Sequence, residues 1–142
     1  MKNRINGLSA VVVVCIMMFA SGAAIAKDKF DGSSNLICAT ISVVACVSGS
    51  NCQRGEARTF DLPEFMTIDF KKKIIHVTYD GGSTEADSPI RNSEMSETQL
   101  VLQGVENGHG WSMTVHQDSG RMSIGVIGET MSFAMFGVCK AI

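Results

Sequence analysis

Four of the five cysteines lie outside the amino-terminal apolar run that holds Cys15, and they are the most reactive side chains of the remaining chain. Cys38, Cys46 and Cys52 lie within fifteen positions of one another. Cys139 lies close to the carboxyl end of the chain. Cysteine sulfur can bind a metal, serve as a redox centre, or link two parts of a chain as a disulfide. The sequence contains no C-x-x-C pair, the spacing typical of structural zinc sites and redox motifs. The cysteine pattern therefore favours disulfides.

The first 26 residues have the pattern of a secretory signal peptide. Lys2 and Arg4 form a short basic region, and an almost wholly apolar run covers residues 8–20. The sequence Ala-Ile-Ala that ends at Ala26 is the small-x-small pattern that signal peptidases cleave. The apolar run is shorter than the roughly 20 residues that a membrane-spanning helix needs. We therefore expect residues 1–26 to be a cleaved signal peptide.

The mature chain, residues 27–142, is expected to be a single exported domain. The leader carries two of the twelve basic residues and no acidic ones, which leaves ten basic against fourteen acidic residues and a net charge of −4. Mild acidity disfavours nucleic acid and anionic membrane surfaces as partners. We expect a monomer that is periplasmic or secreted and has no membrane span after cleavage. An oxidising compartment of this kind again favours disulfides.

Alternation of apolar and polar residues with a period of two predicts an all-β fold. Residues 53–64 are expected to form an irregular link or a short helix, and one strand is expected to end near Pro89. Eight strands are enough to close a small antiparallel barrel or half-barrel whose interior is filled by side chains. The predicted strands cover residues 36–45, 65–70, 73–79, 84–90, 98–105, 110–116, 121–127 and 130–139.

Turn sequences predict which residues of the last four strands face one another. Four-residue connections at 106–109 and 117–120, and a two-residue type II′ turn at Gly128-Glu129, place one apolar face inward. Gly104 would leave room beside Trp111. In the earlier strands, a turn at Lys71-Lys72 would set Ile68 opposite Ile75 and Met66 opposite Val77. The predicted inward rows are Gly104, Trp111, Val126 and Met131; then Leu102, Met113, Ile124 and Phe133; then Leu100, Val115, Met122 and Met135.

The predicted topology ranks the disulfide pairings. The first and last strands of an eight-strand meander run antiparallel, which brings Cys38 beside Cys139 and leaves Cys46 to pair with Cys52. A link between Cys38 and Cys46 is excluded, because eight strand residues span about 26 Å and a disulfide reaches about 7 Å between Cα atoms. The pairing of Cys38 with Cys52 and of Cys46 with Cys139 remains an alternative.

The first strand contains one conflict with the preferred pairing. Ile37, Ile41 and Val43 suggest that odd positions face inward, whereas Cys38 has the opposite parity. Either a bulge near residue 39 changes the parity, or the disulfide crosses the rim of the barrel.

Other candidate sites are better explained as structure. The histidines His76, His109 and His116 are not spaced as a metal pair, and we expect them at the surface. Four of the six methionines in the mature chain fall in the predicted apolar rows, as flexible core residues do, so we expect no copper site. No G-x-S-x-G motif occurs, and no two carboxylates are marked as a pair. We expect no enzymatic activity, no cofactor and no metal.

Three segments carry a resemblance to a known group of proteins. LICATISVVAC, PIRNSEMSETQLVLQGVENGHGWSM and FAMFGVC resemble small exported proteobacterial proteins that share a domain of unknown function. The resemblance covers most of the mature chain and implies a shared disulfide-bearing fold, without a reaction or a ligand. The predicted architecture is also similar in topology to the calycin barrels, although the Gly-x-Trp motif of lipocalins is absent from the first strand.

Two functions fit this reading. The first is a binding domain whose interior takes a small apolar ligand near Trp111, Met113 and Phe133, for which a void above roughly 300 Å³ would be favourable. The second is a structural or protein-interaction domain of the cell envelope. Its contact surface would involve Val101, Phe136 or a loop at residues 91–97. Phe136 is the large apolar residue predicted on the outer face.

Overall fold

The fold was determined as a computed structural model that describes residues 30–79, 82 and 84–142. The predicted signal peptide, residues 1–26, lies outside the described residues. No helix among the described residues is long and apolar enough to cross a membrane. The secondary-structure elements, in chain order, are β1 (Leu36–Val47), β2 (Gln53–Gly55), the 3₁₀ helix η1 (Ala57–Phe60), β3 (Phe65–Asp69), β4 (Ile74–Tyr79), β5 (Thr84–Met95), β6 (Gln99–Glu106), β7 (His109–His116), β8 (Arg121–Ile127) and β9 (Met131–Ala141).

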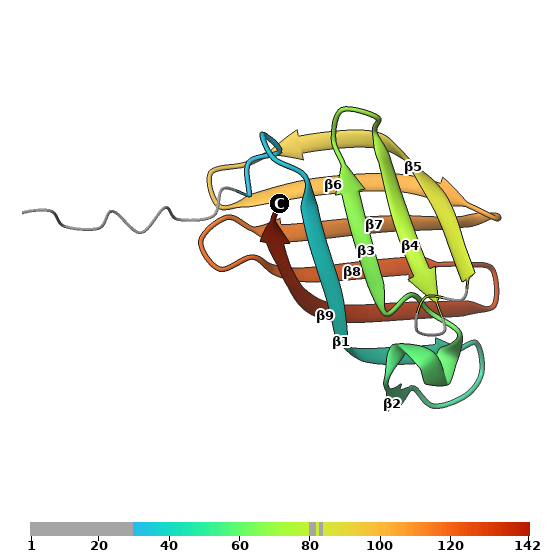
Figure 1. Cartoon of the computed structure of the whole chain (residues 1–142). Helices are drawn as coiled ribbons and strands as arrows, with labels where there is room; N and C mark the ends of the chain where they lie inside the picture. The colour runs from blue at the N-terminus through green and yellow to red at the C-terminus, as the bar shows by residue number, and fades with distance from the viewer. Residues whose placement is uncertain (1–29, 80–81, 83) are drawn as a thin grey trace, which may run out of the picture.

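Eight of these strands form a closed antiparallel barrel (Figure 1). Each strand from β3 to β8 pairs with the next, and β1 pairs with both β3 and β9 to close the sheet. The short strand β2 adds to the second half of β1, and η1 follows it. The prediction of an eight-stranded meander barrel is therefore confirmed, and the barrel is closed rather than half-open. The segment predicted as a link or short helix forms β2 and η1.

Strand β1 changes the face that it turns inward at a β-bulge. The register with β9 shifts between Thr40 and Ser42, which leaves Ile41 as the extra residue. The Ile41 side chain is 64% exposed, so the prediction that Ile41 faces inward is wrong. Ile37 is also exposed, because it lies before the bulge on the outward parity. An extra residue in one strand inverts the alternation that follows it. The predicted bulge is therefore confirmed, at residue 41, two positions beyond residue 39.

The bulge explains how Cys38 and Val43 both face the core despite their opposite parity. Cys38 lies before the bulge and Val43 after it, and both are fully buried. Cys38 lies directly opposite Cys139 in the ladder between β1 and β9, with 4.0 Å between their Cα atoms, and the two form a disulfide. A second disulfide joins Cys46 to Cys52. The preferred pairings are confirmed, and two disulfides are typical of an oxidising compartment.

The predicted register holds for most hairpins. Ile68 lies opposite Ile75 and Met66 opposite Val77. In the later hairpins Leu102 lies opposite Met113, as predicted. The connection between β6 and β7 is a two-residue turn, Asn107-Gly108, in which both residues have positive φ angles of 48° and 78°. This is the conformation that Asn-Gly favours in hairpins, and it keeps the predicted register.

The predicted type II′ turn at Gly128-Glu129 is wrong. Ile127 pairs with Ser132, and the backbone N–H of Gly128 donates to the carbonyl of Met131 at 2.9 Å. The register of β9 is fixed instead by β1, because Val47 lies opposite Met131. The shift is two residues, so the same faces point inward but the rows change. Phe133 now lies opposite Val126, while Met131 is 39% exposed and leaves the core.

Strand β5 does not end near Pro89, as predicted, but continues to Met95. Its first half pairs with β4 and its second half with β6, with a bulge between Ile90 and Asn92. The predicted loop at residues 91–97 is therefore mostly strand. Pro89 occupies the position where β5 exchanges one partner for the other. A proline is tolerated there because the ladder is interrupted at this point.

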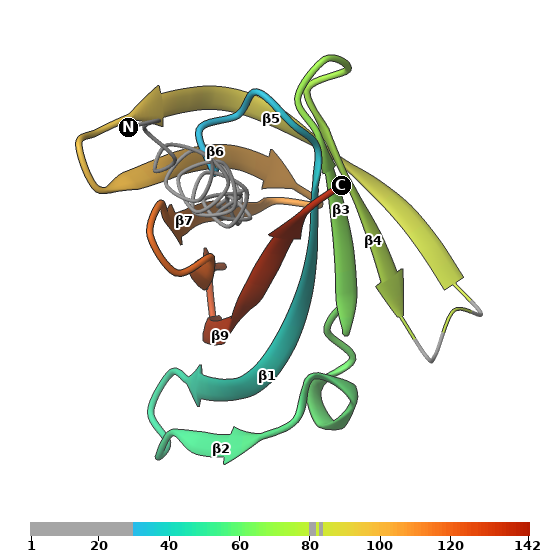
Figure 2. The same cartoon turned by 60° about the vertical axis from the view of Figure 1, so that its left-hand side comes forward.

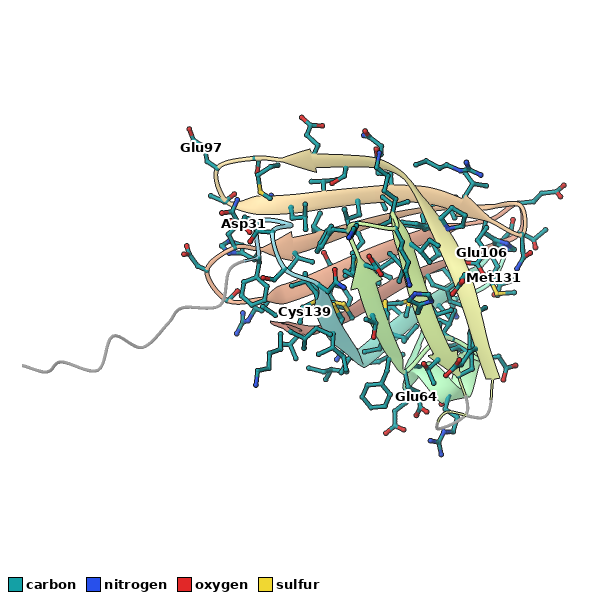
Figure 3. All side chains as sticks on the ribbon, turned by 45° about the horizontal axis from the view of Figure 1, so that its top comes forward. Asp31, Glu64, Glu97, Glu106, Met131 and Cys139 are labelled. Atoms are coloured by element: carbon teal, nitrogen blue, oxygen red, sulfur yellow. A yellow bond between two sulfur atoms is a disulfide. The ribbon has the colours of Figure 1, made fainter. Side chains whose placement is uncertain are left out.

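The two ends of the barrel differ in how they are covered. We define the closed end as the end that carries Phe30 and the 117–120 turn, and the open end as the end that carries the Asn107-Gly108 turn. Phe30 is buried against the backbone of the 117–120 turn, since a Cβ added at Gly120 would lie 2.6 Å from its ring. Figure 3 shows Glu97 near the closed end, and Glu106 with Met131 at the open end.

Candidate ligand-binding cavity

The interior of the barrel is hollow toward the open end. A cavity of about 260 Å³ extends inward from the rim of this end. Trp111, Met113 and Phe133, which the sequence predicts as ligand-lining residues, all lie in its wall. The volume is slightly below the 300 Å³ or so at which drug-sized sites begin. It is well above the engineered apolar cavity of about 150 Å³ that holds benzene. The cavity therefore suits a small molecule rather than a long chain.

The walls of the cavity are apolar because they are built from the inward-facing positions of the strands. These positions alternate along each strand, so residues two apart share the interior. The described apolar residues of the wall come from the segment before β3 and from strands β3, β4, β7, β8 and β9. They are Leu62, Pro63, Met66, Ile75, Val77, Trp111, Met113, Ile124, Val126, Phe133 and Met135.

Two features position Trp111 in the wall: the space above Gly104, which has no side chain, and a hydrogen bond to Ser88. A Cβ added at Gly104 would lie 2.3 Å from the indole ring and 2.5 Å from the carbonyl oxygen of Pro89. Glycine at this position therefore lets the indole lie across β6, as the sequence predicts. The indole Nε1–H donates to the hydroxyl of Ser88 at 2.9 Å. Ser88 is only 3% exposed and is the sole polar residue in the described core.

A rim of polar side chains lies above these apolar walls. Tyr79, Glu106 and His109 all line the cavity. Each continues the inward-facing parity of its strand: Glu106 follows Leu102 and Gly104 at intervals of two, for example. This rim is not predicted from the sequence, because residues 106–109 are expected there to form a turn. The rim could have been found by continuing the alternate inward-facing positions of β4 and β6 past their last apolar residues, to Tyr79 and Glu106.

The rim carries negative charge. Burial raises the pKa of the Tyr79 phenol, and the nearby carboxylate of Glu106 raises this pKa further. The Nδ1 atom of His109 lies 3.0 Å from the carbonyl oxygen of Asn107. A carbonyl can only accept, so Nδ1 carries the hydrogen and Nε2 of the neutral ring is an acceptor. The lining residues include no lysine or arginine within the described part of the chain.

The mouth of the cavity lies at the open end of the barrel, where β5 also separates from β6. Ile90 donates its backbone N–H to Lys73 beside β4. Successive backbone N–H groups of a strand point to opposite edges of that strand. The backbone nitrogen of Pro89 therefore faces β6, and it has no hydrogen to donate to that strand. Figure 2 shows the first half of β5 and the end of β4 leading away from β6. Tyr79 and Ser88 line the cavity from one side of this mouth, and Glu106 lines it from the other.

The other candidate residues do not assemble into a site. His76 contacts Asp87 across the β4–β5 ladder, and His116 is exposed at the end of β7. Met66, Met113, Met122 and Met135 are buried among other apolar side chains. No group of three histidine, cysteine or acidic side chains within residues 30–79, 82 and 84–142 could hold a metal ion. The cavity is therefore the best-formed candidate site in the described part of the molecule.

Comparison with known proteins gives no match to a family model, a curated protein or a solved structure.

Proposed function

We propose that the protein is a non-enzymatic binding domain that carries a small apolar ligand in the cavity at the open end of the barrel. The proposal includes export to the periplasm or beyond the cell, and action as a monomer. The observation that carries it is the combination of a hollow apolar interior of about 260 Å³ with a polar rim at the open end of the barrel. Concave, mostly apolar pockets at the mouths of β-barrels are recurrent ligand sites.

The side chains of the barrel leave this space unfilled. Eight-stranded barrels can be packed solid by their own side chains. Here Gly104 carries no side chain, and the indole of Trp111 occupies the space that a Cβ there would need, while the cavity beside the indole stays unfilled. Atoms that line an empty space lose dispersion contacts. A ligand of suitable shape would restore those contacts and remove apolar surface from water, which is worth roughly 25 cal/mol for each Å² buried.

The first experiment measures binding of a neutral probe. Propylbenzene should bind the wild-type protein and change the fluorescence of Trp111, which is the only tryptophan in the sequence. Val126→Phe should abolish binding, because Val126 lies in the cavity wall. Val101→Phe is the matched control, since Val101 has the outward parity of β6, and it should bind normally. Absence of binding to wild-type protein would overturn the proposal.

Native mass spectrometry of protein isolated from its own periplasm provides a second test. A bound small molecule that is retained by the wild-type protein and lost from the Val126→Phe variant would support the proposal. A copurifying protein without any small molecule would instead favour the second candidate function below.

A second candidate function, a structural or protein-interaction domain of the envelope, is favoured by an apolar patch on the outside of the barrel. Phe65 on β3 and Val138 on β9 both lie opposite Ala39 of β1, so the three form one row across the closure of the barrel. Phe136, which the sequence predicts as a contact residue, is exposed beside this row. Sedimentation analysis of wild-type protein and of Phe65→Ser would test this function. A complex that is lost in the variant would support it, and identical behaviour of both proteins as monomers would contradict it.

A further inference from the structure

We propose that the ligand is a small amphiphilic amine, with an apolar body in the cavity and a protonated amino group at Glu106. This inference rests on the proposed function, because it requires that the cavity binds a ligand. It adds the chemical class of that ligand, which the apolar walls alone do not define.

The first step is the position of Glu106. Even-numbered residues of β6 face the interior, and Leu100, Leu102 and Gly104 are buried there. Glu106 is the next residue in this series and lines the cavity at its rim. It is the one lining residue with a fixed charge in the described part of the chain. A carboxylate on an inward-facing position is costly unless it is solvated or paired.

The second step is that Glu106 differs from the other half-buried acids. Among the described residues, the half-buried carboxylates are those of Glu64, Asp69 and Glu106. Glu64 pairs with Arg58 at 3.0 Å, and Asp69 lies 3.6 Å from Lys72. No basic side chain within residues 30–79, 82 and 84–142 forms an ion pair with Glu106. The cation that would complete the pattern is supplied by the ligand.

The third step is that the surrounding groups suit a cation. Tyr79, Trp111 and Phe133 all line the cavity, and aromatic faces attract ammonium groups within about 6 Å of the ring centre. The carboxylate of Glu106 is also close enough to raise the pKa of Tyr79. The same negative field would repel a carboxylate ligand such as a fatty acid. No lysine or arginine of the described lining residues would offset that repulsion.

The fourth step is size. A cavity of about 260 Å³ exceeds the roughly 150 Å³ that accommodates benzene, so it accepts one aromatic ring with a short side chain. An arylalkylamine with one ring places its ring among Trp111, Met113 and Phe133. Its amino group then reaches the polar rim, where Glu106 lies.

The experiment compares three probes of similar size by isothermal titration calorimetry. These are 2-phenylethylamine, 3-phenylpropionate and propylbenzene, which are a cation, an anion and a neutral molecule. The amine should bind at least tenfold more tightly than the anion, since a hydrogen bond to a charged group contributes an amount of that order. This comparison needs only wild-type protein. Equal affinity of the amine and propylbenzene would overturn the inference and leave the proposed function intact.

Substitution then assigns the effect to one carboxylate. Glu106→Gln should weaken binding of 2-phenylethylamine about tenfold and leave the affinity for propylbenzene unchanged. Glu97→Gln is the matched control, because Glu97 is an exposed acid far from the open end (Figure 3). It should leave both affinities unchanged. An equal loss in both variants, or no loss in Glu106→Gln, would contradict the inference. Failure of all three probes to bind wild-type protein would instead contradict the proposed function.

Discussion

The closed and open ends of this barrel are built from the same strands but are packed in opposite ways. Toward the closed end, Leu36, Leu100 and Val115 are fully or almost fully buried, and Phe30 covers them. Toward the open end, Trp111, Val126 and Phe133 are only partly buried and surround a cavity. The interior of an eight-stranded barrel can therefore be solid in one layer and hollow in the next, depending on the side chains of each layer.

The difference follows from how the strands are held together. The Cys38–Cys139 disulfide joins the first strand to the last, and Cys139 donates its backbone N–H to Gly120 in the 117–120 turn at 2.7 Å. Near the mouth, Pro89 removes a ladder hydrogen bond between β5 and β6, and the Trp111–Ser88 hydrogen bond spans the two sides instead. The disulfide between the first and last strands lies toward the closed end, whereas Cys46 of the second disulfide lies opposite Ser132, toward the open end. The cavity lies where the β5–β6 ladder is interrupted.

The largest effect is expected from removing the long disulfide. Replacing Cys38 and Cys139 together by alanine should lower the free energy of unfolding by about 4.7 kcal/mol, because the bond closes a loop of about 100 residues in the unfolded chain. Replacing Cys46 and Cys52 should cost about 2.4 kcal/mol in the same treatment, since that loop is short. Urea unfolding of both double variants measures the difference. Equal losses of unfolding free energy in the two double variants would show that the Cys38–Cys139 disulfide stabilises the fold no more than the Cys46–Cys52 disulfide does.

A matched pair of valines compares the packing of the two ends directly. Val115→Ala, in the fully buried layer, should lower the free energy of unfolding by about 2–3 kcal/mol, because it leaves a cavity in a close-packed core. Val126→Ala, in the wall of the existing cavity, should cost about 1 kcal/mol, because its side chain is only partly buried. Thermal or urea unfolding provides the measurement. A larger loss for Val126→Ala would contradict the assignment of solid and hollow ends.

The sequence predicts the features that depend on local turns and on alternation. The register of β6, β7 and β8 follows from Asn107-Gly108 and the 117–120 turn, and both hairpins form as predicted. The disulfide pairing follows from the topology of a meander, because Cys38 and Cys139 must meet when the first and last strands pair. These predictions succeed because each uses interactions between neighbouring strands of known order.

The detailed register between the first and last strands, which lie far apart in the chain, is not predicted. Gly128-Glu129 is compatible with a tight turn, yet pairing of Val47 with Met131 lengthens the loop. The bulge at Ile41 also follows from β1 meeting β9, and apolar side chains on both of its faces conceal the change of parity. The polar rim is not predicted for another reason. Polar residues at strand ends, such as Glu106 and His109, have the composition of a turn, and only their alternate spacing from the inward-facing residues shows that they face the interior.

Gly104→Ala tests the arrangement that places Trp111 in the cavity wall. The added methyl group would lie 2.3 Å from the Trp111 ring and 2.5 Å from the Pro89 carbonyl, so one of them must move. We expect a loss of about 1–3 kcal/mol in the free energy of unfolding, as in other overpacked cores. Displacement of the indole should also change the fluorescence of the single tryptophan. Gly125→Ala is the control, because a Cβ there meets no atom within 4 Å. Similar effects of both variants would contradict a specific role for Gly104.

The smallest expected effect concerns the ionisation of Tyr79. Burial and the Glu106 carboxylate both raise its pKa above the ordinary 10.0, and removing the carboxylate should therefore lower this pKa part of the way back. Tyr79 is the only tyrosine in the sequence, so ultraviolet absorbance follows its titration without interference. Glu106→Gln should shift the titration to lower pH, whereas Glu97→Gln at the other end should leave it unchanged.

The same pKa has a consequence for stability that can be measured independently. The folded protein keeps the Tyr79 proton at pH values where the unfolded chain has released it. Above pH 10.0 the unfolded state therefore binds fewer protons than the folded state, and stability falls as the pH rises through the folded pKa. In Glu106→Gln the folded pKa is lower, so this loss should be smaller. If Glu106→Gln changed neither the loss of stability above pH 10.0 nor the titration of Tyr79, the Glu106 carboxylate would have no electrostatic effect on the phenol. That result would contradict a negative field at the open end.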